Sequence, residues 1–238
     1  MTSAKLETLL NRNYEVKIGE YISRGFGVYL SNLGGFIGLS FLTTLITIIL
    51  NFIPGLGNIA SSVLGAGFTF VGLAIIRRQT YTFKDFFKGL SNKYFLRVFL
   101  VSLVGMAITV LGLILWILPG IYISVCYVFV LQIAIDWELD FWEALEASRK
   151  LISRNWFSMF GFILVLGSIN PGIALLVSVS FFFNPRSGSI TLDLINLVGA
   201  VFLGISIFLA PLTICAQLVA YDDIIGNNPD PIPSGMDL

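Results

Sequence analysis

The chain contains no histidine, and only 12% of its residues are charged. Histidine is the commonest metal ligand and the commonest general base near neutral pH, so its absence removes the usual foundation of a metal centre or an acid–base site. A soluble domain carries roughly 25% charged residues, about twice the fraction found here. So few charges do not cover a water-facing surface of this size, and the composition indicates that lipid surrounds most of the protein.

Other signals are missing too. The two cysteines, Cys126 and Cys215, each lie inside an apolar run and form no CxxC pair, so we interpret both as small core residues. We expect no cleavable signal peptide, because charged residues are spread over residues 5–24 without an uninterrupted apolar run. No phosphate-binding glycine loop, nucleophile elbow or metal-ligand spacing is found in the sequence, so it predicts no cofactor and no catalytic residue.

Long apolar runs dominate what is present. Of the 238 residues 56% are hydrophobic, and the mean hydropathy is +0.90. Several runs exceed the roughly eighteen residues that are typical of a transmembrane helix. The predicted class is therefore an all-α, polytopic membrane protein.

A pattern of about sixty residues occurs three times. Each copy has an amphipathic stretch, a Ser/Asn/Arg cluster with an aromatic residue, an apolar run, a Pro-Gly pair and a second apolar run. The pairs begin at Pro54, Pro119 and Pro171. This pattern predicts six transmembrane helices arranged as three repeats of an amphipathic helix plus a transmembrane hairpin.

The repeats form one predicted integral membrane domain over residues 1–224, followed by a disordered acidic tail at 225–238. The repeat boundaries are 15–78, 79–137 and 138–224, and the spans lie near 33–53, 58–76, 95–118, 120–135, 156–183 and 194–219. Pro171 leaves two alternatives for 156–183, either one kinked helix or a short hairpin, and we favour the kinked helix.

Smaller elements are also predicted from local signals. An amphipathic helix is expected near 15–31, and the turn between the third and fourth spans is expected at Leu118–Gly120. Thr82 with Asp85, and Asp140 with Glu143, have the spacing of helix-capping pairs.

Basic residues cluster at one end of the predicted hairpins. They precede the first span or lie near 77–97 and 149–154, whereas the loops at Pro54 and Pro119 carry none. By the positive-inside rule, the N-terminus and those two connections are cytoplasmic. With an even number of spans, the C-terminus is cytoplasmic as well.

No Asp, Glu, Lys or Arg lies centrally in a predicted span, which argues against an ion-coupled pump. The candidate polar pathway consists of neutral side chains: Asn170, Gln217, Gln132 and Tyr127. The alternative, which we favour, is that these groups form helix–helix hydrogen bonds worth about 0.6 kcal/mol each.

Six basic side chains are candidate contacts for anionic lipid, at about 1 kcal/mol each. They are Arg77, Arg78, Lys84, Lys88, Arg149 and Lys150. The alternative is that these residues only set the topology, and the acids interleaved with them favour it.

Small residues recur at four-residue spacing in the first two spans, at Gly34, Gly38, Gly57, Ser61, Gly65 and Thr69. Such stripes let helices approach closely. We favour packing within the chain over a homo-oligomer, which this pattern leaves open.

Several segments resemble a bacterial group. They are Leu118-Pro119-Gly120-Ile121-Tyr122, Phe141-Trp142-Glu143-Ala144-Leu145, Asn155-Trp156-Phe157 and Ala220-Tyr221-Asp222-Asp223. These segments are similar to the membrane domain of bacterial glycerophosphodiester phosphodiesterases and to YciC-like integral membrane proteins. The resemblance implies a six-helix protein without an established activity, located in the bacterial inner (plasma) membrane, and an internal membrane stays open. The phosphodiesterase activity of the fused proteins belongs to a soluble domain that has no counterpart here.

The expected function is therefore that of a non-enzymatic scaffold, assembly or membrane-organising factor whose partners are the lipid bilayer and other membrane proteins. The alternative is a passive carrier or channel for a small or amphiphilic solute. A lipid-modifying enzyme is the least favoured class, because no catalytic constellation is found. Nucleic-acid binding has no support, since the chain is neutral overall.

Overall fold

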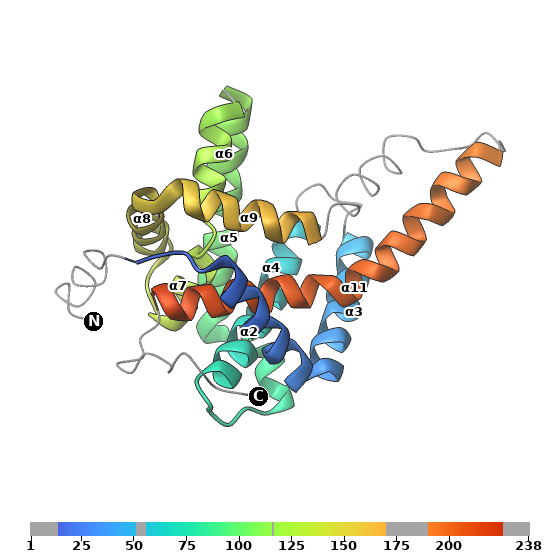
Figure 1. The fold of residues 1–238 in the computed structure, drawn as a ribbon, viewed down its shortest axis with the longest axis horizontal. Coiled ribbons are helices and arrows are strands. Elements are labelled where there is room, and N and C mark those ends of the chain that lie inside the picture. Colours follow the sequence, from blue (N-terminus) through green and yellow to red (C-terminus); the bar gives the residue numbers. More distant parts are fainter. Residues whose placement is uncertain (1–13, 51–55, 116, 170–189, 226–238) are drawn as a thin grey trace.

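The computed structural model describes residues 14–50, 56–115, 117–169 and 190–225. The regular structure of these residues is helical and contains no β-strand, which confirms the all-α class (Figure 1). The elements are α2 (Ile18–Ser31), α3 (Leu33–Leu50), α4 (Leu56–Ile76), η1 (Phe83–Leu90), α5 (Asn92–Leu115), α6 (Ile117–Cys126), α7 (Val130–Asp136), α8 (Phe141–Ile152), η2 (Ser153–Asn155), α9 (Trp156–Ile169) and α11 (Ile190–Ile224).

Five helical segments are long and apolar enough to cross a membrane. They are Leu33–Leu50, Asn92–Leu115, Ile117–Asp136, Phe141–Ile169 and Gly204–Ile224, and a shorter apolar helix covers Ala60–Ile76. In lipid every backbone N–H and C=O must be paired within the protein, which a helix achieves along its own length. The chain is accordingly a membrane-embedded protein. The choice between a kinked helix and a hairpin after Ile169, and the tail after residue 225, lie outside the described residues.

Short surface helices form where the sequence predicts amphipathic segments. Helix α2 buries Tyr21, Gly25 and Tyr29, which recur every four residues on one face, as expected for an amphipathic helix. Before η1, the Asp85 carboxylate accepts the backbone N–H of Thr82 at 2.6 Å, which confirms the capping pair. Asp140 occupies the N-cap position of α8, but its side chain makes no capping hydrogen bond.

The fourth predicted span lies within the candidate membrane segment Ile117–Asp136, but the helix of this segment is interrupted, which the sequence did not predict. Helix α6 stops at Cys126 and α7 starts at Val130, with turn residues between them. The turn before α6 was also misplaced, because α6 begins at Ile117 and contains Pro119 in its first turn. A proline is tolerated there, since the N–H groups of the first turn have no partner within the helix.

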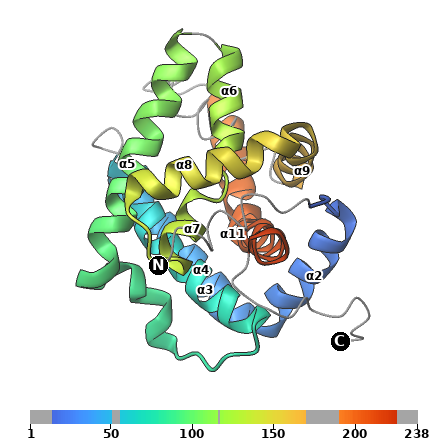
Figure 2. The same ribbon diagram turned by 90° about the vertical axis from the view of Figure 1, so that its left-hand side faces the viewer.

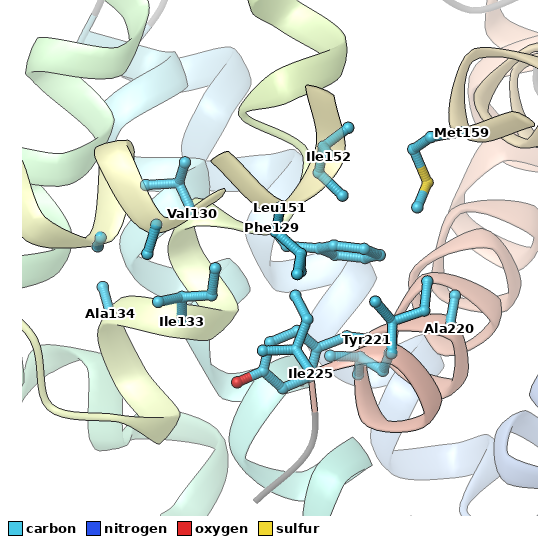
Figure 3. Packing of buried hydrophobic residues seen from close by; sticks show 14 of the residues in the cluster. Phe129, Val130, Ile133, Ala134, Leu151, Ile152, Met159, Ala220, Tyr221 and Ile225 are labelled. Atoms are coloured by element: carbon cyan, nitrogen blue, oxygen red, sulfur yellow. The ribbon is translucent and has the colours of Figure 1, made fainter. Parts of the chain in front are cut away.

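The largest core cluster joins α7, α8, α9 and α11. Phe129 and Tyr221 are fully buried and meet edge to face, with ring centroids 5.7 Å apart. Figure 3 shows Ile152 and Met159 beside Phe129, with Ile225 close to Tyr221. This apolar core holds the ends of α7 and α11 in place, and the charged residues of the candidate site lie at these ends.

Helix α4 and η1 approach each other so closely that only glycine fits between them. A Cβ placed on Gly67 would lie 2.0 Å from the carbonyl oxygen of Phe86, whereas a Cβ on Gly65 would meet no atom within 4 Å. Gly34 and Gly38 also face open space. The close contact in α4 therefore uses a glycine outside the four-residue stripe that the sequence suggested.

We predict that Gly67→Ala lowers the free energy of unfolding by about 1–3 kcal/mol, because the added methyl group forces η1 away from α4. Gly65→Ala is the matched control two residues away. It should be neutral or stabilising by up to about 1 kcal/mol, since alanine is the better helix former. Unfolding of the two variants in detergent micelles measures the difference, and equal stabilities would contradict the packing described.

Candidate functional site

The helices α4, α7 and α11 end at one point, where their charged residues form an ion cluster. Arg77, just after α4, donates two hydrogen bonds to Asp136, from Nη1 at 2.5 Å and from Nη2 at 2.8 Å. Its Nε donates to Asp222 of α11 at 2.8 Å. The planar guanidinium thus binds one carboxylate with two nitrogens and a second carboxylate with the third.

This ion cluster is largely withdrawn from solvent. The side chains of Arg77, Asp136 and Asp222 are 14%, 9% and 4% exposed. Burial alone would lower the pKa of Arg77, but the hydrogen bonds and charges of the two carboxylates outweigh it and raise the pKa. The guanidinium therefore remains charged at every accessible pH. Removing any one member of such a buried cluster is strongly destabilising, because the remaining charge is left unpaired.

Two tyrosines complete the ion cluster. The hydroxyl of Tyr221 donates to Asp136 at 2.8 Å, and that of Tyr21 on α2 lies 2.7 Å from the carboxylate of Asp223. Burial, together with the hydrogen bond to Asp223, raises the pKa of Tyr21, so this hydroxyl stays protonated. Helix α2 is in this way attached to the end of α11, next to the ion cluster member Asp222.

The break between α6 and α7 is supported by side chains from neighbouring helices. Ser148 of α8 donates to the carbonyl of Cys126 at 2.7 Å, and Gln217 Nε2 of α11 donates to the carbonyl of Val128 at 2.6 Å. Carbonyls freed by a helix break inside a membrane protein need such partners. The break is therefore a built feature that ties α8 and α11 to the second hairpin.

A lateral groove of about 320 Å³ lies next to the break. Apolar residues of α5 and Leu145 of α8 form much of its wall. Its lining also includes hydroxyl-bearing side chains, from Ser62, Ser102, Thr109, Ser124 and Tyr127, and no charged side chain. Such a lining suits an uncharged group that carries a hydrogen-bonding atom.

The predicted polar pathway is only partly assembled among the described residues. Gln217 supports the helix break, Tyr127 lines the groove, and Gln132 is 5% exposed. The Oε1 atom of Gln132 has no hydrogen-bond partner in the described part of the chain. Asn170 lies outside the described residues. These groups do not line a common cavity in the structure as described.

The six candidate lipid contacts differ in their surroundings, because four of them pair with carboxylates of the protein. Arg77 is held by two carboxylates in the ion cluster, which leaves little of it for a headgroup. Lys88 pairs with Asp85 at 2.7 Å, and both Arg149 and Lys150 pair with Glu146. Arg78 follows the end of α4 and Lys84 belongs to η1, and both residues are exposed. Lipid binding by these residues stays a prediction.

The sequence analysis did not predict that residues at the end of α11 take part in the ion cluster. Asp222, Tyr221 and Tyr21 were not among the candidates, although a basic residue after one span and acids at the ends of two others were a usable signal. Among the described residues, no group of three His, Cys, Asp or Glu side chains could hold a metal ion. Comparison with protein-family models, curated proteins and solved structures gave no match.

We predict that Arg77→Ala lowers the free energy of unfolding by about 3–5 kcal/mol, because Asp136 and Asp222 are left buried without a counter-charge. Arg149→Ala is the control. It removes a pair with Glu146 in which both side chains are more than one third exposed, and it should cost no more than about 1 kcal/mol. Unfolding in mixed detergent micelles measures both. Equal losses would show that the ion cluster is not a structural centre.

Proposed function

We propose that this chain is a non-enzymatic integral membrane protein that scaffolds, assembles or organises other membrane components. The observation that carries the proposal is that the described interior is filled with side chains and that its charges are paired. Where α4, α7 and α11 converge, Phe129, Ile133 and Tyr221 fill the space, and each is at most 2% exposed. The charges at this convergence are paired with one another, so they are used to hold the helices together rather than to bind a solute.

The proposal includes the membrane arrangement. Three hairpins enter from the cytoplasmic side, giving six membrane segments with both termini in the cytoplasm. The basic residues near the ends of α4 and α8 support this orientation. The similarity to YciC-like membrane proteins is part of the same proposal.

The surface offered to partners consists of α2, η1 and α8. Exposed aromatic residues project from it, with Phe83 73% exposed and Trp142 62% exposed. Charged side chains surround them, including Lys84 of η1 and Glu143 of α8. Exposed aromatic side chains within a charged rim are the usual composition of a protein contact surface.

We expect Trp142→Ala to remove proteins that co-purify with the chain in mild detergent, without a change in melting temperature. Phe41→Ala is the control, since Phe41 is 58% exposed on α3, away from the proposed contact surface. Quantitative mass spectrometry of cross-linked preparations compares the two. If both variants keep the same partners as the wild type, α8 is not the contact surface.

A passive carrier for a small or amphiphilic solute is the second candidate, and the groove beside the α6–α7 break favours it. Its uncharged, hydroxyl-bearing lining would suit an amphiphile entering from the lipid. Under this reading Gln132 and Gln217 would contribute to a path through the membrane.

The two glutamines separate the candidates. Gln132→Leu should leave stability unchanged or raise it, because Gln132 Oε1 is buried without a partner. Gln217→Leu should cost about 1–3 kcal/mol, because the carbonyl of Val128 then loses its donor. In proteoliposomes, a scaffold predicts no flux of a fluorescent short-chain lipid with either the wild type or Gln132→Leu. Flux in the wild type that Gln132→Leu abolishes would support the carrier instead.

A further inference from the structure

Helix α8, the first part of the apolar segment Phe141–Ile169, has the charged face of a helix that lies among the lipid headgroups. Its outer face carries Glu146, Arg149 and Lys150, whose side chains are 37%, 45% and 53% exposed. Placing such charges in the hydrocarbon is unfavourable. An amphipathic helix with this charged face lies in the membrane surface, with its apolar side turned inward.

Both legs of the α5–α6 hairpin contact α8 near the same height. On the α6 side, the hydroxyl of Ser148 donates to the carbonyl of Cys126. On the α5 side, a Cβ at Gly105 would lie 3.8 Å from Cδ2 of Leu145. Figure 2 shows α8 running across the two legs, which continue together beyond it.

The part of the hairpin beyond α8 is short. Gly105 lies ten positions before Leu115, the last residue of α5, and Leu118 lies eight positions before Cys126. At 1.5 Å of rise per residue, these legs extend about 15 Å and about 12 Å. The hydrocarbon core of a bilayer is about 30 Å thick. Two independent legs therefore reach only about halfway across.

The end of the hairpin is suited to hydrocarbon rather than water. Ile114, Leu115, Ile117 and Leu118 are between 69% and 76% exposed, and no charged residue occurs between Arg97 and Asp136. The two helices also lie very close to each other at this end. A Cβ on Gly112 would lie 3.1 Å from Cα of Gly120, so the two backbones nearly touch. A turn that emerged into water would leave these four apolar side chains exposed to it.

We propose that the α5–α6 hairpin is a re-entrant wedge that stays within one leaflet and that its tip binds the acyl chains near the bilayer midplane. This departs from the full spans that the sequence predicts for the second repeat. The leaflet is the cytoplasmic one, and this part of the proposal rests on the orientation given under the proposed function. The depth of the tip does not depend on that orientation.

The test uses single cysteines in the full-length chain, reconstituted in vesicles, with Cys126 and Cys215 replaced by alanine. Leu118→Cys reports the tip and Lys150→Cys reports α8. We expect a membrane-impermeant maleimide to modify Lys150→Cys from one side only and Leu118→Cys from neither. A nitroxide at Leu118→Cys should be relaxed by oxygen and not by a water-soluble nickel chelate, as expected at the midplane.

Each other outcome counts against the wedge. Modification of Leu118→Cys from the side opposite Lys150→Cys would show a complete crossing, and modification from the same side would place the tip outside the membrane. A nitroxide depth at the far headgroups would also overturn it. Ile117→Cys repeats the measurement if Leu118→Cys fails to fold. Labelling of Lys150→Cys from the non-cytoplasmic side would instead refute the proposed orientation and leave the depth of the tip unaffected.

Discussion

A buried guanidinium has to be paired, and the rest of this structure is arranged around the pairing of Arg77. The side chain follows the last turn of α4, and its three nitrogens are satisfied by carboxylates at the ends of α7 and α11. Three segments that are far apart in the chain are thereby held at one point. Tyr221 and Tyr21 add hydrogen bonds to the acids on either side, so α2 is drawn into the same assembly. The apolar core beneath the ion cluster fixes the positions of these ends, and the ion cluster in turn holds the helices that form the core.

The second constraint is that backbone carbonyls freed where a helix stops inside the protein need hydrogen-bond partners. The break between α6 and α7 would be costly in a lipid environment, and two side chains from other helices offset that cost. Ser148 reaches one freed carbonyl and Gln217 reaches another. Polar residues that looked like a pathway in the sequence are, in this case, part of the packing. The same logic accounts for the placement of α8, which is held at the break through Ser148.

The sequence predicted the elements well and their meeting points poorly. Long apolar runs and the capping pair at Thr82 and Asp85 indicate helices directly, because these signals are local. The break at residues 127–129 carries no such signal, since Tyr127, Val128 and Phe129 contain neither glycine nor proline. The ion cluster was equally invisible, because its members are separated by 59 and 145 positions. Charge counting placed Arg77 at the cytoplasmic face, but it could not show which acids this residue contacts.

The distance along the chain between Arg77 and Asp222 also has a consequence for biosynthesis. At about 5–20 residues per second, the ribosome adds the intervening 145 residues in roughly 7–29 seconds. During that interval Arg77 has left the ribosome, and its second carboxylate does not yet exist. Until α7 and α11 are made, water and the headgroups of the surrounding lipids solvate this guanidinium at the membrane surface. The residue that the finished protein hides is thus exposed to the lipid headgroups while the chain is being made.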